Sequence, residues 1–252
     1  MVNNSLAVCF FFSILFFLPK FSQSQSINND KDHYLWFDEA VGMENTGLVN
    51  GVVYDEKYRM INEKTKFFLS REFLPGSVTY DGQTYYDLEL KFDVFDEDVL
   101  LKLPNRLGGI TLKLIKDKVD AFVIDGHRFV KLNAKDSEEK TLSEFYEVMN
   151  NSSAFTLFKK HRKKDFNRKD QRKIYFEFVD IRGVFVLLYN NTYYSISKKK
   201  DVIEIFPEYK KEIDAFYERV RSLRNSDPDK FTLSLMNRID ILISGKNNQV
   251  TE

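Results

Sequence analysis

The chain has 252 residues, of which 43% are hydrophobic and 30% are charged, and its 38 Lys and Arg balance its 38 Asp and Glu. This composition excludes an intrinsically disordered chain and a collagen-like chain, and the length allows one sizeable hydrophobic core or a core with an appendage. The balanced charge provides no global attraction to nucleic acid or to a membrane surface.

Residues 1–26 are predicted to be a secretory signal peptide. The apolar run Leu6 to Pro19 precedes a polar stretch in which Ser22, Ser24 and Ser26 supply the small residues of a cleavage site. The run is shorter than the roughly 20 residues of a membrane-spanning helix, so we expect no transmembrane segment after cleavage. An uncleaved anchor is the alternative.

The single cysteine, Cys9, lies inside this apolar run, so the mature chain would contain none. Such a chain can form no disulfide and has no thiol for catalysis. An exported protein without cysteine must be held by its core alone, which favours a bacterial periplasm, cell envelope or exterior over disulfide-rich eukaryotic secretion.

Residues 27–48 are predicted to form an N-terminal arm. The stretch is polar and contains the single tryptophan, Trp36, beside Tyr34 and Phe37. We expect this aromatic group to pack on the following domain, with a ligand-stacking tryptophan as the alternative.

Residues 49–197 are predicted to form an antiparallel β domain. Between Phe67 and Leu132 short apolar-polar alternating runs are separated by turn residues, and Asp81-Gly82 and Asp125-Gly126 favour two-residue hairpin turns. Further strands are expected over 154–158, 174–179, 184–189 and 192–196, with turns at Asp180 to Gly183 and at Asn190-Asn191.

Leu142 to Met149 is ambiguous, because Thr141 to Glu144 fits a capping box while the following residues fit a strand. We favour a strand because β patterns flank it on both sides. About ten strands result, and a sheet of that size curls, splits or closes. The fold class is therefore predicted as α+β and mainly antiparallel β, a meander, curled sheet or partial barrel.

Two C-terminal helices are predicted in residues 198–245, packed on the sheet. The first begins near Pro207 and has an apolar face from Tyr209 to Leu223, and the second begins after Asp227 and can end at Gly245. Residues 246–252 are expected to be a loose tail.

A resemblance covers most of the predicted mature chain. It rests on Phe67-Phe-Leu69, Gly76-Ser-Val-Thr-Tyr-Asp-Gly-Gln-Thr-Tyr85, Lys91-Phe-Asp93 and Ser197-Lys-Lys-Lys-Asp-Val-Ile-Glu-Ile-Phe-Pro-Glu-Tyr-Lys-Lys-Glu-Ile213. In these stretches the chain resembles uncharacterised exported β-rich proteins of Bacteroidota. The resemblance implies a periplasmic or envelope setting and a strand over Phe145 to Val148. That group has no established activity, so the resemblance implies no site residues.

No catalytic, metal or cofactor site is predicted. The three histidines, His33, His127 and His161, have no metal-ligand spacing between them, and no nucleophile elbow or phosphate-binding glycine loop occurs. The densest acidic group is Asp93, Asp96, Glu97 and Asp98. We interpret it as a solvated hairpin turn, with glycoside hydrolysis or calcium binding as alternatives.

The candidate binding site is a basic run between two predicted strands, expected to form a protruding hairpin tip. It carries nine cationic residues against Asp165 and Asp170: Lys159, Lys160, Arg162, Lys163, Lys164, Arg168, Lys169, Arg172 and Lys173. Such a tip could bind an anionic polysaccharide, lipid headgroups or an acidic partner. Nucleic acid is disfavoured by export and by the single interleaved aromatic, Phe166. The alternative is a solvated loop that prevents edge pairing.

Three functions therefore remain. The first, which we favour, is a non-catalytic exported envelope protein that acts by binding. The second is a carrier that holds an apolar ligand in the curled sheet. The third is a hydrolase whose acidic residues come from distant strands, with Asp93 and Asp96 as candidates.

Overall fold

The computed structural model describes residues 31–250 apart from 33, 37–40, 105–108 and 171. The predicted signal peptide and His33 lie outside the described residues. In the described part of the arm, Tyr34 lies beside Tyr86, with ring centroids 6.2 Å apart, and Lys31 forms an ion pair with Asp87. Trp36 is 69% exposed. The expectation that this tryptophan packs on the sheet is therefore wrong.

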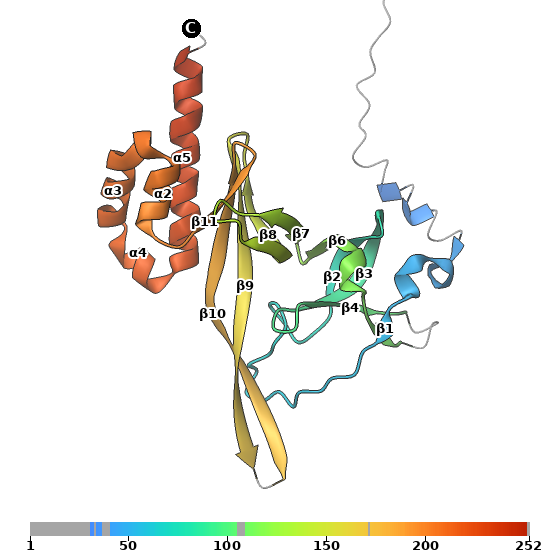
Figure 1. Cartoon of the computed structure of the whole chain (residues 1–252). Helices are drawn as coiled ribbons and strands as arrows, with labels where there is room; N and C mark the ends of the chain where they lie inside the picture. The colour runs from blue at the N-terminus through green and yellow to red at the C-terminus, as the bar shows by residue number, and fades with distance from the viewer. Residues whose placement is uncertain (1–30, 33, 37–40, 105–108, 171, 251–252) are drawn as a thin grey trace, which may run out of the picture.

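The described residues form one antiparallel sheet of 11 strands, followed by helices at the C-terminus (Figure 1). The strand order is β1-β5-β4-β3-β2-β6-β7-β8-β9-β10-β11, and the sheet is not closed. This confirms the predicted fold class. The strands are β1 (Val52–Val53), β2 (Leu74–Tyr80), β3 (Gln83–Asp93), β4 (Asp98–Lys102), β5 (Thr111–Lys113), β6 (Val119–Ile124), β7 (His127–Lys135), β8 (Thr141–Asn151), β9 (Phe155–Asp170), β10 (Lys173–Tyr189) and β11 (Thr192–Ile196).

Turn chemistry places three of the hairpins where the sequence predicted them. Asp81 and Gly82 have φ of 54° and 79°, and Asp125 and Gly126 have φ of 48° and 81°. A two-residue type I′ turn requires positive φ at both positions, which Asp and Gly tolerate. Asn190 and Asn191 turn β10 into β11 in the same way, with φ of 47° and 59°. The ambiguous segment from Leu142 to Met149 is strand β8, as favoured.

The prediction of a turn at Asp180 to Gly183 is wrong. These residues lie inside β10, a strand of 17 residues that continues through them. The pairing with β9 shifts by one residue between Ile181 and Val184, which is a β-bulge. Gly183 allows this close approach, since a Cβ atom there would lie 2.8 Å from the carbonyl oxygen of Lys160. A bulge and a turn favour the same residue types. Here the chain forms a bulge because both sides of it pair with β9.

The curled part of the sheet, from β1 to β8, surrounds a core of packed aromatic rings. Phe122 and Phe129 are stacked with centroids 4.8 Å apart, and Phe92 and Phe145 each lie 5.1 Å from Phe122. All four side chains are at most 2% exposed. Side chains therefore fill the concave side of the sheet.

The C-terminal helices cover one face of β9, β10 and β11. They are α2 (Lys199–Ile205), α3 (Lys210–Arg219), α4 (Arg221–Ser226) and α5 (Pro228–Val250), with a 3₁₀ turn η5 (Pro207–Tyr209) between α2 and α3. Leu157 and Leu187 of the strands pack with Phe206, Phe231 and Leu235 of the helical segment. The helical segment therefore packs on the sheet.

Two details of the predicted helices differ from the structure. The helix expected from Pro207 to Leu223 is divided into η5, α3 and α4. The helix expected to end at Gly245 continues to Val250, so residues 246–250 are helical rather than a loose tail. Its start is as predicted, since Asp227 accepts a hydrogen bond from the backbone N–H of Lys230 at 2.9 Å.

The segment between β1 and β2 crosses from the curled sheet to the outer half of β10. Ile61 donates its N–H to the carbonyl of Phe176 at 3.0 Å, and Phe178 donates to the carbonyl of Lys64 at 3.1 Å. The segment therefore covers the side of β10 that faces away from β9 beyond the end of β11. The segment forms these hydrogen bonds with β10 only. It does not occupy the other long edge of the hairpin, which is formed by the outer part of β9.

Candidate functional site

The basic run forms a long two-stranded ribbon. We define the ribbon as residues 160–170 of β9 and residues 173–181 of β10; it projects beyond the rest of the sheet in Figure 1, in yellow and orange. The expected protruding hairpin is present, but most of the basic run is strand rather than loop. Period-two alternation of β structure places His161, Lys163 and Asp165 on a half-buried face and Arg162 and Lys164 on an exposed face.

Three of the nine candidate cations are paired with acids of the same chain. Lys159 lies 2.6 Å from Asp229 of α5, Lys160 lies 2.7 Å from Glu97 and also contacts Glu144, and Lys163 lies 3.1 Å from Asp180. Their side chains are only 9 to 12% exposed. These three cations join parts of the fold, and their charge is already neutralised.

The other six candidates point into solvent. Arg168 lies 3.7 Å from Glu177 with a side chain that is 72% exposed, so this ion pair is loose. The remaining five, in the part of the chain that the structure describes, have no carboxylate within 4 Å: Arg162, Lys164, Lys169, Arg172 and Lys173. The free positive charge of the run is therefore concentrated on the outer ribbon.

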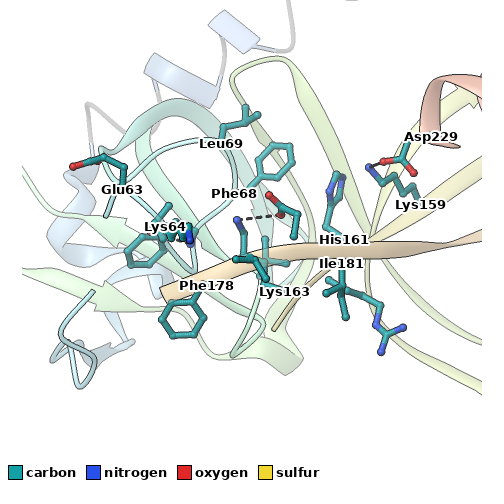
Figure 2. Close-up of a pocket in the computed structure, with 16 residues that line it drawn as sticks. Glu63, Lys64, Phe68, Leu69, Lys159, His161, Lys163, Phe178, Ile181 and Asp229 are labelled. Atoms are coloured by element: carbon teal, nitrogen blue, oxygen red, sulfur yellow. Dashed lines mark hydrogen bonds and ion pairs between the residues drawn. The ribbon is translucent and has the colours of Figure 1, made fainter. Parts of the chain in front are cut away.

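A cavity of about 690 Å³ lies where the ribbon meets the segment between β1 and β2 and the start of α5. Figure 2 shows Lys159 next to Asp229 on one side of it and Phe68 and Phe178 on the other. Its lining mixes cations, acids and rings, and most of its cations have acidic partners. Among these are Lys64, which lies 2.7 Å from Glu177, and Lys163.

Two histidines meet one carboxylate beside this cavity, an arrangement that the sequence did not predict. Glu147 of β8 contacts Nδ1 of His127 and Nε2 of His161, each at 2.5 Å. The ring of Phe68 packs edge-on against both imidazoles. Burial alone would raise the pKa of Glu147, but the hydrogen bonds from His161 and His127 hold that pKa below its ordinary value. The group links β7, β8 and β9.

The acidic group predicted to be a solvated turn is instead largely buried around Lys66. Asp93 and Lys66 are both 0% exposed, and Lys66 Nζ lies 2.6 Å from Asp93 Oδ2 and 3.4 Å from Asp96 Oδ2. Tyr58 places its ring 4.7 Å from the ammonium group. Asp93 Oδ1 accepts the N–H groups of Phe95 and Asp96. The acids do lie at the hairpin turn between β3 and β4, but the expected solvation is wrong, because Lys66 is buried against Asp93 and other lysines pair with Glu97 and Asp98.

Protonation in this buried group follows from its surroundings. Burial raises the pKa of the Asp93 carboxyl above its ordinary value, against the opposing effects of the Asp96 amide and Lys66. Burial alone would lower the pKa of Lys66, but hydrogen bonds with Asp93 and Tyr54 raise it. Lys66 is therefore charged, and it forms a buried ion pair with Asp93.

The described residues have two further properties, which concern membrane spans and metal ligands. None of their helices is long and apolar enough to cross a membrane. Among them, no group of three or more His, Cys, Asp or Glu is placed to hold a metal ion. His127, Glu147 and His161 are therefore not such a group.

We predict that Lys66→Met lowers the free energy of unfolding by about 3–5 kcal/mol, because it leaves Asp93 buried without its cation. Lys66→Met combined with Asp93→Asn should recover most of this loss, since neither member of the pair is then charged and the amide oxygen still accepts the N–H groups of Phe95 and Asp96. Urea denaturation monitored by circular dichroism measures both. Lys118→Met, which breaks the surface ion pair with Asp81, is the control and should cost less than about 1 kcal/mol. Equal losses for Lys66→Met and Lys118→Met would contradict this account.

A second prediction concerns pH. Because the pKa of Glu147 is lower in the folded chain, the folded state binds fewer protons than the unfolded state between the two pKa values. The stabilisation is complete above the unfolded pKa of about 4.3 and is lost as pH falls through the folded pKa. Between pH 5 and pH 3 the stability difference between wild type and Glu147→Gln should therefore shrink, as measured by urea denaturation. Exposed Glu89→Gln controls for removing one carboxylate, and a difference that grows on acidification would refute the assignment.

Comparison with known proteins adds no assignment to this geometry. No family model, no curated protein and no solved structure matches the chain.

Proposed function

We propose that the protein is a non-catalytic exported binding protein that contacts an anionic partner through the ribbon. The observation that carries this proposal is the division of charge within the basic run. Lys159, Lys160 and Lys163 form ion pairs within the fold. The other six cations are exposed: five lie on the ribbon and Arg172 lies at its turn, and among the described residues only Arg168 has a carboxylate within 4 Å.

Charge placed this way suits binding better than stability. Exposed cations attract an anion over about 8–10 Å at moderate salt and form charge-assisted hydrogen bonds on contact. They contribute little to the stability of an isolated protein and repel each other. The segment between β1 and β2 covers the β10 side of the ribbon, but Arg162, Lys164 and Arg168 on β9 remain exposed.

The proposed setting is a periplasm, the cell envelope or the exterior. It rests on the apolar run Leu6 to Pro19 with the small residues that follow it. An anionic envelope polysaccharide, anionic lipid headgroups or an acidic protein would each fit the charge of the ribbon in that setting.

The two alternative functions have less support. A carrier needs room for an apolar ligand, but Phe92, Phe122, Phe129 and Phe145 fill the concave side of the sheet. A hydrolase built on Asp93 and Asp96 needs carboxylates that reach a substrate, but Asp93 is 0% exposed and ion-paired with Lys66.

We predict that neutralising exposed cations of the ribbon weakens binding to polyanions. The variant combines Arg162→Gln, Lys164→Gln, Arg168→Gln and Lys169→Gln, all exposed positions. Its affinity for dextran sulfate and for polyglutamate, measured by biolayer interferometry at about 0.1 M salt, should fall at least about tenfold, because each lost contact contributes a few tenths to 1 kcal/mol.

The matched control removes four exposed cations from the helical segment: Lys210→Gln, Lys211→Gln, Arg221→Gln and Arg238→Gln. Both variants have the same net charge, so a difference between them reports position. If both lose affinity equally, binding follows net charge alone and the ribbon is not the site.

A further inference from the structure

One side of outer β9 has no strand beside it. β8 pairs with β9 only as far as Lys159, and beyond that residue β9 pairs with β10 alone. Within the described residues no other segment forms a backbone hydrogen bond to this part of β9. We call residues 161–169, on the side away from β10, the β9 edge. An open edge of this length is a template for another strand.

The direction of the backbone groups along the β9 edge follows from the pairing. Residues of an antiparallel strand alternately point their N–H and C=O groups toward one neighbour and away from it. Phe176 and Phe178 donate to the segment between β1 and β2 at 2.8 and 3.1 Å, so they point away from β9. Their partners across the pair, Asn167 and Asp165, therefore point away from β10, as do Lys163 and Lys169.

The cationic side chains at the β9 edge disfavour pairing with a strand that is itself cationic. Arg162, Lys164 and Arg168 project from the exposed face around Phe166, which is 50% exposed. A second copy of this chain pairing edge to edge would bring cations opposite cations, and such pairs are destabilising. A strand with acidic residues at every second position would instead place acids beside Arg162, Lys164 and Arg168 of this face.

We propose that the β9 edge binds an extended acidic segment of a partner protein by strand addition, as a further strand of the sheet. This inference rests on the proposed function and narrows its anionic partner to a polypeptide. Backbone hydrogen bonds from residues 163, 165, 167 and 169 provide affinity, and the cationic exposed face requires acidic residues at alternate positions.

The test uses two synthetic decapeptides, capped at both ends, each with five Glu and five Thr. In one, Glu and Thr alternate; in the other, the five Glu are consecutive. Both carry the same charge, but only the alternating peptide presents all its acids on one face of a strand. We expect the alternating peptide to bind the full-length protein about tenfold more tightly, from several cross-strand pairs. Equal affinities would overturn strand addition while leaving the polyanion binding of the ribbon intact.

A backbone variant provides the second readout. Asn167→Pro removes an N–H that points away from β10, so it spares the β9–β10 pairing and changes no charge. It should abolish the preference for the alternating peptide and leave affinity for dextran sulfate unchanged. Asn167→Ala, which keeps the N–H, is the matched control and should behave as wild type. Full preference retained in a folded Asn167→Pro variant would overturn the proposal, as would dimers of the unliganded protein that Asn167→Pro dissociates in sedimentation experiments.

Discussion

The pairing of β9 with β10 is the interaction on which the rest of the structure depends. Near its base the pair offers Leu157 and Leu187 to the C-terminal helices, and farther out it offers backbone groups of Phe176 and Phe178 to the segment between β1 and β2. That same segment delivers Lys66 to Asp93 in the curled part of the sheet. One two-stranded ladder therefore connects the helical core, the aromatic core and the projecting charge.

The sequence predicted those features that local chemistry determines. Positive φ at Asp81-Gly82 and Asp125-Gly126 is a property of the turn residues themselves, so the hairpins could be located before the structure was known. Asp180 to Gly183 had a similar composition and was mispredicted as a turn. There the outcome depends on β9, whose pairing converts a possible chain reversal into a bulge.

The location of the candidate site was predictable from the sequence. Which of its cations are paired with acids was not. The density of Lys and Arg between residues 159 and 173 is visible in the sequence. The acids that neutralise a third of these cations come from distant positions, such as Glu97 and Asp229. The link between His127 and His161 through Glu147 has the same origin, because only strand pairing brings β7, β8 and β9 together. Pairing partners of charged groups are a tertiary property, which spacing along the chain does not encode.

The bulge near Gly183 puts the two halves of β10 in opposite phase. Phe185 faces the helices from an odd position, whereas Phe176 and Phe178 reach the same face from even positions, because their partners on β9 are all odd-numbered. The extra residue of the bulge makes this change of phase possible, because Arg182 and Gly183 together lie opposite His161. Deleting one of these two residues would remove the bulge and keep Phe176 and Phe178 on their present face. Deleting one residue between Phe178 and Ile181 would instead move both rings to the opposite face and turn Glu177 inward. A change of one residue in length is therefore compatible with this fold at the bulge and not farther out along β10.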